Sequence, residues 1–191
     1  MATLTGTGVD QLIERVDRAV ALGGAEAIAA AIKQTLSDLI RSRALKLPAS
    51  FCRPRPESYA RRLLHRDPAT GWTAVVMTWG PGQGTLLHDH AGIWCVEGVV
   101  EGEMEVLQYE MTGASDGRWR FAPRGRVHAL AGSSGALIPP FEYHVLRNAK
   151  PGATSVTLHV YGGEMDHCHV FEENRDGTWR KVERRLAYTA D

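Results

Sequence analysis

Short runs of apolar and β-branched residues, separated by glycine, proline and aspartate, fill the sequence from Trp72 onwards. Runs of this kind between turn residues are typical of β-strands. Asp176-Gly177 is a hairpin signal between the last two runs. Many short strands at this spacing predict a mainly β fold, either a sandwich or a barrel. The expected strands cover residues 72–79, 93–100, 103–109, 119–122, 127–131, 135–138, 155–161, 169–173 and 178–183.

The first part of the chain has a different periodicity. Apolar residues recur at helical spacing from about residue 10 to residue 45, and Gly23-Gly24 interrupts the pattern, so we expect two N-terminal α-helices. With 191 residues, of which 43% are hydrophobic, the chain is long enough for one well-packed domain. We therefore expect a single domain over residues 1–191, with a helical segment over 1–47 and a barrel over 70–185.

Composition argues against several classes of function. Lysine plus arginine and aspartate plus glutamate number 22 each, and no basic stripe stands out, so we expect neither nucleic acid nor a membrane surface as a partner. No signal peptide or membrane-spanning run is recognisable. Three cysteines, Cys52, Cys95 and Cys168, form an odd and sparse set that argues against a disulfide framework. We expect a cytosolic protein.

Two histidines one residue apart, His88 and His90, are the strongest chemical signal in the sequence. Residues two apart on a strand share a face, so both imidazoles can bind one metal ion if this run is extended, while Asp89 faces elsewhere. His144 follows Pro139-Pro140 at an expected strand start, and we predict it as the third ligand. Three neutral imidazoles suit zinc or non-haem iron, and ligand type alone does not choose between them.

Other clusters fit metal chemistry less well. A hydrolytic zinc site of the His-x-His-x-Asp-His type needs aspartate where this chain has Gly92. The run Asp-His-Cys-His at residues 166–169 is not expected to bind a second ion, because neighbouring strand residues face opposite ways. Four glutamates are interpreted most simply as a solvated face: Glu97, Glu101, Glu103 and Glu105.

The histidine pair lies in a longer pattern that resembles a known motif. Gly82-x5-His88-x-His90-x4-Cys95-x6-Gly102 is similar to the first motif of the cupins throughout, except that Cys95 stands where most cupins have a metal-binding glutamate. The resemblance implies a cupin, or jelly-roll, β-barrel with N-terminal α-helices.

A second stretch narrows the resemblance. Pro139, His144 and Asn148 are similar to the second cupin motif, although Phe141 replaces its usual glycine. Three histidines with cysteine in the glutamate position resemble the cysteine dioxygenase family, whose members convert a thiol and O2 to a sulfinate at mononuclear iron(II). The resemblance implies Fe(II) as the cofactor, with no organic cofactor.

The family resemblance also assigns substrate-binding residues. Tyr59-x-Arg61 resembles the clamp that holds the substrate carboxylate, and Cys168 lies where the family has a cysteine near the substrate. A guanidinium suits this role because it can donate two parallel hydrogen bonds to a carboxylate. Arg62 has the same group, and the match to the family's Tyr-x-Arg pattern implies Arg61 rather than Arg62 as the clamp.

Thr157-x-His159-x-Tyr161 resembles the family's Ser-x-His-x-Tyr motif. Alternation along a strand puts all three side chains on one face, so we expect a hydrogen-bond chain that ends at the Tyr161 hydroxyl. By the same resemblance, Cys95 and Tyr161 are the pair that can form a thioether crosslink beside the iron. Tyr161, His159 and Cys95 are thus the expected catalytic residues.

These features predict an iron(II)-dependent thiol dioxygenase whose partners are a small-molecule thiol and O2. L-Cysteine is the first substrate choice because of Arg61 and Cys95. The alternatives are 3-mercaptopropionate or mercaptosuccinate, since residues 63–65 and 79–83 resemble bacterial enzymes that oxidise 3-mercaptopropionate. Two further alternatives are a metal-binding cupin without catalytic activity and a zinc or manganese isomerase.

Overall fold

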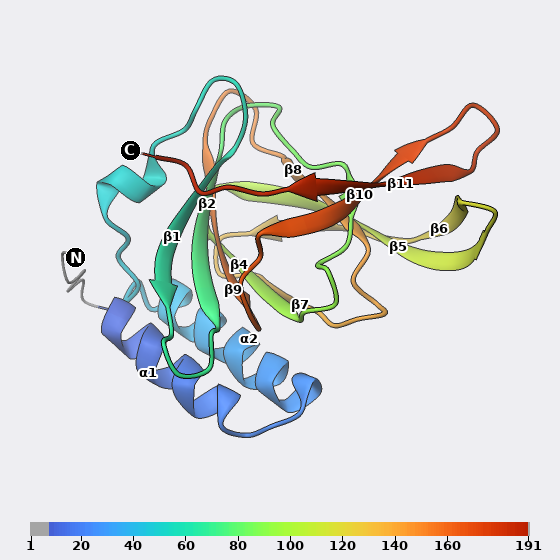
Figure 1. Cartoon of the computed structure of the whole chain (residues 1–191). Coiled ribbons are helices and arrows are strands. Elements are labelled where there is room, and N and C mark those ends of the chain that lie inside the picture. The colour runs from blue at the N-terminus through green and yellow to red at the C-terminus, as the bar shows by residue number, and fades with distance from the viewer. Residues whose placement is uncertain (1–7, 191) are drawn as a thin grey trace.

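A computed structural model describes residues 8–190 as two β-sheets with a pair of helices packed along one side (Figure 1). The first seven residues of the expected helical segment lie outside the described residues. The helices are α1 (Val9–Val20), α2 (Ala25–Arg41) and the short 3-10 helix η1 (Ala49–Cys52). The strands are β1 (Ala60–Arg66), β2 (Thr73–Trp79), β3 (Leu87–His88), β4 (Cys95–Glu101), β5 (Glu103–Ser115), β6 (Arg118–Leu130), β7 (Ser134–Leu137), β8 (His144–Asn148), β9 (Ser155–Tyr161), β10 (His167–Glu173) and β11 (Trp179–Arg185).

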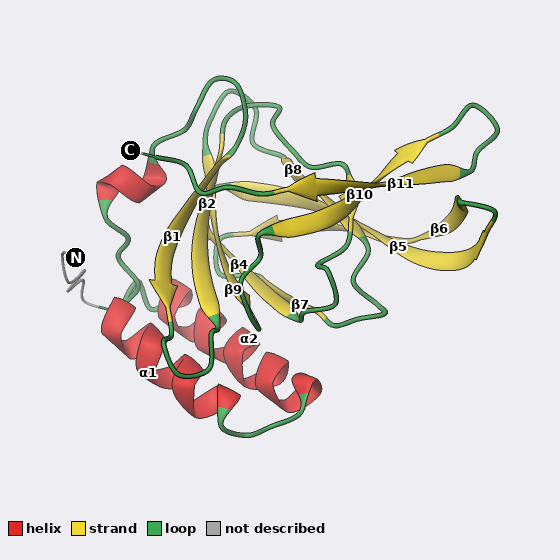
Figure 2. Cartoon of the chain, in the orientation of Figure 1, coloured by secondary structure: helices red, strands yellow, loops and turns green. Residues whose placement is uncertain are grey.

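The mainly β, jelly-roll barrel that the sequence predicts is confirmed. One sheet has the strand order β1-β2-β9-β4-β7, and the other closes through β10-β11-β6-β5-β8-β3. The strand pairs are antiparallel throughout. The β5–β6 and β10–β11 hairpins extend away from the helices (Figure 2). Asp176-Gly177 forms the turn between β10 and β11, as expected, with Gly177 at a φ of 77° that glycine adopts readily.

The two helices cover the outer face of the first sheet. Their apolar residues, including Leu12, Ile32 and Leu36, form one buried cluster with sheet residues such as Leu158 and Val160. Because strand side chains alternate, burial of Leu158 and Val160 against the helices turns the neighbouring β9 residues toward the barrel interior. The helical layer thereby fixes which residues of β9 face the interior.

Helix α2 approaches β4 closely at Gly98. A Cβ atom at that position would lie 3.1 Å from Ile40 Cδ1 and 3.4 Å from Leu36 Cβ. Contacts this short are tighter than ordinary van der Waals separation, so glycine allows the helix to reach the strand. The sequence break at Gly23-Gly24 is also confirmed, because α1 ends at Val20 and α2 begins at Ala25.

Three strand expectations differ from the structure. The runs 119–122 and 127–131 belong to one strand, β6, because a register shift opposite Gln108 and Tyr109 accommodates Pro123. Strand β1 was not expected, since its sequence is rich in arginine, and the first sheet therefore begins at Ala60 rather than near residue 70. Strand β3 is only two residues long, so it ends before His90.

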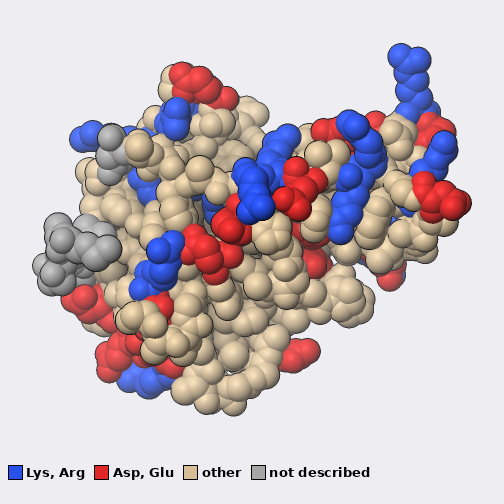
Figure 3. Space-filling view, viewed as in Figure 1, with Lys and Arg blue, Asp and Glu red and all other residues tan. Residues whose placement is uncertain are grey.

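The projecting hairpins carry charges of both signs next to one another (Figure 3). Arg118 pairs with Asp176 between the two hairpins at 2.5 Å, and Arg126 pairs with Glu105 within β5–β6 at 2.7 Å. Both arginines and Asp176 are exposed, so each pair contributes little to stability. In the part of the chain that the structure describes, no helix has both the length and the apolar character needed to cross a membrane.

Replacing Leu36 with alanine should destabilise the helix–sheet packing. The Leu36 side chain is 0% exposed, and truncation of such a residue costs about 2–5 kcal/mol in the free energy of unfolding. Urea denaturation followed by circular dichroism measures the change. Leu22→Ala is the matched control, because Leu22 is 62% exposed and its loss should alter stability by less than about 0.5 kcal/mol.

Candidate metal centre and substrate cavity

Three histidines converge inside the barrel. His88 ends β3, His90 lies just beyond that strand, and His144 begins β8 directly opposite His88 in the antiparallel pair. One ring nitrogen from each histidine lies within 4.8 Å of those of the other two. The assigned strand ends at His88, but the chain turns only at Ala91-Gly92, beyond His90, where Gly92 has a φ of 83°. His88 and His90 therefore reach one site, as the sequence predicts, while Asp89 faces elsewhere.

Backbone carbonyls orient two of the three rings. His88 Nδ1 lies 3.0 Å from the Leu86 carbonyl oxygen, and His144 Nδ1 lies 2.9 Å from the Glu142 carbonyl oxygen. A carbonyl only accepts, so Nδ1 of each ring must donate, which leaves Nε2 with a free lone pair. Within residues 8–190, the buried His144 Nε2 has no hydrogen-bond partner. A metal ion at the Nε2 atoms would satisfy it, so these residues fit a metal.

Burial keeps the imidazoles neutral, as metal ligation requires. Desolvation lowers the pKa of His90 to about 3 and holds the pKa values of His88 and His144 below the ordinary histidine value. The neighbouring histidines lower the pKa values of His90 and His144 further by charge repulsion. The three nitrogens are therefore unprotonated at neutral pH and available to a cation.

Glu142 is a buried residue for which the sequence suggests no role. Its Oε2 accepts a hydrogen bond from the His90 backbone N–H at 2.7 Å and lies 3.3 Å from His90 Nδ1. The Glu142 side chain thus holds the backbone at His90 and lies beside the His90 ring, whose Nδ1 has no hydrogen-bond partner within residues 8–190. The backbone carbonyl of Glu142 orients His144. Burial raises the pKa of Glu142 to about 7. Its position two residues before His144 was the available signal, since both then face the same side of an extended chain.

Asp89 turns away from the three histidines. Its carboxylate lies 2.8 Å from the His169 backbone nitrogen and 2.8 Å from His169 Nδ1, which ties the end of β3 to β10. His169 Nδ1 is thus occupied by its contact with Asp89, and His167 contacts Asp166. Among the described residues, the one group that meets the geometry of a metal site is His88, His90 and His144.

A cavity of about 190 Å³ opens beside the three histidines. Arg61 lines it and is buried; its Nη2 donates to the Met165 carbonyl at 3.0 Å, and its Nε has no hydrogen-bond partner among residues 8–190. Arg62 faces the other side of β1, where its Nη1 lies 2.9 Å from the Arg53 carbonyl oxygen. Other residues of the cavity wall include Tyr59, Trp79, His159, Tyr161, Met165, Cys168 and Arg184.

Tyr59 and Cys168 lie in the same cavity wall as Arg61. The Tyr59 ring stacks on Trp79 with 4.4 Å between ring centroids, which holds it in place. Burial raises the pKa of the Cys168 thiol to about 11, so this side chain is a neutral thiol rather than a reactive thiolate.

Cys95 and Tyr161 are directly opposite residues of β4 and β9. The two side chains hydrogen-bond, and both are buried beside the metal-binding histidines. Burial holds the pKa of each well above its ordinary value, so thiol and phenol are both neutral.

The expected hydrogen-bond chain along β9 is present in part. Thr157 Oγ1 lies 2.8 Å from His159 Nε2, and Trp79 Nε1 donates to the same oxygen at 2.9 Å. His159 and Tyr161 stack with ring centroids 6.0 Å apart, and the structure shows no hydrogen bond between them within residues 8–190. The chain therefore stops at His159 rather than at the Tyr161 hydroxyl.

Glu97 does not belong to a solvated face, as the glutamate-rich run suggests, because its side chain lies inside the barrel. It shares the inward face of β4 with Cys95, and its Oε2 lies 3.8 Å from His144 Nε2 and 3.4 Å from His159 Nδ1. Burial raises the pKa of Glu97 to about 8. Alternation from Cys95 was the signal for Glu97, because residues two apart on a strand share a face. Glu101 is exposed as expected, because a register shift between Val99 and Glu101 interrupts the alternation.

A model of the cysteine dioxygenase type I family matches residues 25–174 of this chain. The chain belongs to this family. The matched region contains the three histidines, Arg61, Cys95 and Tyr161, so the cysteine dioxygenase resemblance inferred from the sequence motifs is confirmed.

Individual relatives are distant from this cysteine dioxygenase family member. Cysteine dioxygenase type 1 of Rattus norvegicus is 25% identical over 126 residues, which cover 65% of this chain and 60% of the rat protein. The Danio rerio protein of the same name is 22% identical over 116 residues, covering 60% and 56%. The chain thus matches about three fifths of the length of these curated relatives. A solved Klebsiella pneumoniae protein with a double-stranded β-helix domain is 20% identical, with a TM-score of 0.48, covering 63% of this chain and 91% of its own.

Glu142→Ala should weaken metal binding by about 10–100-fold, because loss of a residue that orients a metal-binding histidine typically has this effect. Removing a direct ligand, in His144→Ala, should abolish stoichiometric binding. Metal titration monitored by calorimetry measures both. His128→Ala is the control, since His128 is exposed on β6, and it should bind metal like the wild type. Unchanged affinity in Glu142→Ala would contradict the orienting role.

Proposed function

We propose that this protein is an iron(II)-dependent thiol dioxygenase that oxidises a small thiol carboxylate, with L-cysteine as the first choice. The observation that supports this most directly is the shared cavity: three neutral imidazoles and the Arg61 guanidinium face the same 190 Å³ space. A thiol near the histidines can therefore have its carboxylate at Arg61. We also place the enzyme in the cytosol, since all three cysteines are unpaired.

The overall reaction converts RSH and O2 into RSO2⁻ and H⁺, so both oxygen atoms end on sulfur and one proton is released. Iron(II), when held by His88, His90 and His144, supplies the electron chemistry that lets dioxygen combine with a thiolate. Arg61 binds the carboxylate, and its buried position excludes competing water, which strengthens this interaction.

The remaining residues act on the geometry of the bound thiol. Tyr59, held against Trp79, and Cys168 limit the space around the carboxylate end. The Tyr161 phenol, kept protonated by burial, can donate a hydrogen bond to the reacting sulfur or oxygen, while His159 supports its ring by stacking. Apolar wall residues such as Met77 and Val170 keep water out of the reaction space.

Oxygen consumption by the iron-loaded protein tests the function. L-Cysteine, 3-mercaptopropionate and mercaptosuccinate are supplied separately, and mass spectrometry identifies the sulfinate. We expect turnover of at least one thiol, fastest for L-cysteine, and none in His144→Ala. A faster rate with 3-mercaptopropionate or mercaptosuccinate would move the substrate assignment within the class.

Two outcomes would reject the enzyme class. Absence of turnover with every thiol, despite ligand binding that depends on His88, would favour a metal-binding cupin without catalytic activity. Stoichiometric zinc or manganese with little iron in the purified protein would favour an isomerase that needs no dioxygen.

Arg61→Lys should lower kcat/KM by about 10²-fold, mainly through KM, because lysine loses the two parallel hydrogen bonds of a buried guanidinium–carboxylate pair. Steady-state oxygen consumption measures the change. Arg175→Lys, in the exposed turn between β10 and β11, is the matched control and should match the wild type. A KM unaffected by Arg61→Lys would exclude this residue as the carboxylate clamp.

We also propose that Cys95 and Tyr161 form a thioether. The Cys95 S–H bond and one Tyr161 ring C–H bond break, an S–C bond forms, and the two electrons and two protons pass to dioxygen. Intact mass should then fall by about 2 Da after exposure to iron, thiol and oxygen. Cys95→Ala should show no decrease, and an unchanged wild-type mass would contradict the crosslink alone.

A further inference from the structure

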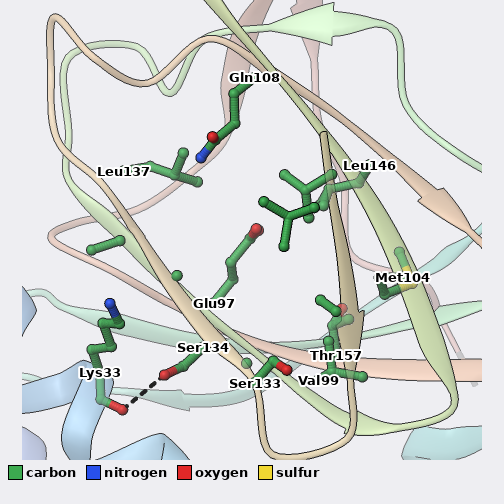
Figure 4. A pocket seen from close by; sticks show the side chains of 16 residues that line it. Lys33, Glu97, Val99, Met104, Gln108, Ser133, Ser134, Leu137, Leu146 and Thr157 are labelled. Carbon is green, nitrogen blue, oxygen red and sulfur yellow. Dashed lines mark hydrogen bonds between the residues drawn. The ribbon is translucent and has the colours of Figure 1, made fainter. Parts of the chain in front are cut away.

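Glu97 lies between two cavities of the barrel. Its side chain points into a second space of about 290 Å³, lined mainly by β4, β5, β6, β7 and β8, where Leu137 and Leu146 lie on either side of it (Figure 4). Lys33 of α2 lies at one edge of this space. Of the residues that the structure describes, Leu146 is the one that lines both this space and the 190 Å³ cavity beside the three histidines. Glu97 therefore approaches His159 from the side opposite the 190 Å³ cavity.

The hydrogen bonds around Thr157 define the tautomer of His159. Trp79 Nε1 can only donate, so the Thr157 oxygen accepts from it. The Thr157 hydroxyl proton then needs an acceptor, and in the described part of the chain its one further partner is His159 Nε2. If Nε2 accepts, the single proton of a neutral imidazole is on Nδ1.

The protonated Nδ1 atom faces Glu97. Nδ1 lies 3.4 Å from Glu97 Oε2, and no other acceptor for it is found within residues 8–190. Glu97 Oε2 is itself buried without a hydrogen-bond partner in that part of the chain. A donor and an acceptor that both lack partners lie within a small side-chain rotation of a good hydrogen bond. A carboxyl group can accept through its carbonyl oxygen whether or not it is ionised.

We propose that Glu97 is a positioning residue that accepts a hydrogen bond from His159 Nδ1–H and, together with Trp79 and Thr157, fixes the tautomer and orientation of His159. The fixed imidazole then stacks against Tyr161 and holds its phenol at the substrate. The tautomer assignment stands independently of the reaction, whereas the kinetic consequence depends on the proposed function.

Side-chain NMR of the full-length chain, loaded with zinc as a diamagnetic ion, tests the tautomer directly. Long-range proton–nitrogen spectra distinguish a protonated from an unprotonated ring nitrogen, and His159→Gln assigns the signals. We expect Nδ1–H in the wild type and in Glu97→Gln, whose amide oxygen can still accept. Glu97→Met, of similar length without an acceptor, should show a mixture of tautomers. An Nε2–H tautomer in the wild type, or an unchanged Nδ1–H in Glu97→Met, would overturn the proposal.

Kinetics of the iron-loaded variants test the consequence. Glu97→Met should lower kcat by about 10–100-fold, as loss of an orienting hydrogen bond does around other active sites, with a smaller change in KM. Glu97→Gln should restore most of the rate, and Glu101→Gln on the exposed end of β4 should leave it unchanged. Equal losses in the Met and Gln variants would show that the carboxyl group itself is needed and would overturn the positioning role. If no thiol is oxidised at all, the proposed function fails, and the NMR result still decides the tautomer.

Discussion

The antiparallel pairing of β4 with β9 determines the chemistry of the barrel interior. Its register places Cys95 opposite Tyr161 and Glu97 opposite His159. Because side chains alternate, a shift of one residue would send these groups to the helices and bring valines into the interior. Burial of apolar β9 residues against α1 and α2 opposes such a shift. The register of β4 against β9 therefore determines both the apolar packing on the outer face and the arrangement of polar groups inside.

The interior combines many ionisable groups with little water. His88, His90 and His144 are stable there as neutral rings. A backbone carbonyl or a carboxyl group lies next to Nδ1 of each ring, so Nε2 is left for a cation. The carboxyl groups of Glu97 and Glu142 are shifted in the opposite sense, with pKa values raised to about 8 and about 7. A bound divalent ion would favour the ionised form of both, so metal binding and the charge of these residues are coupled.

The sequence predicted the helices, most strands and the convergence of three histidines, because each depends on local periodicity or on a spaced motif. It also favoured Arg61 over Arg62 as a residue of the site. Of these two arginines, the structure places Arg61 in the cavity wall. Glu97 was misread, since charge in a hairpin looks the same whether a side chain faces inward or outward. Its direction is decided by pairing with β7 and β9, which are distant in sequence. Glu142 was missed because its partner, His90, lies 52 residues away in the sequence.

Leu146 lines both cavities of the barrel, so its side chain belongs to the wall of a space of about 190 Å³ and of another of about 290 Å³. A smaller residue at this position would enlarge both spaces at once. The room beside the histidines could thus change through a single substitution at a residue that is neither one of the three histidines nor Arg61.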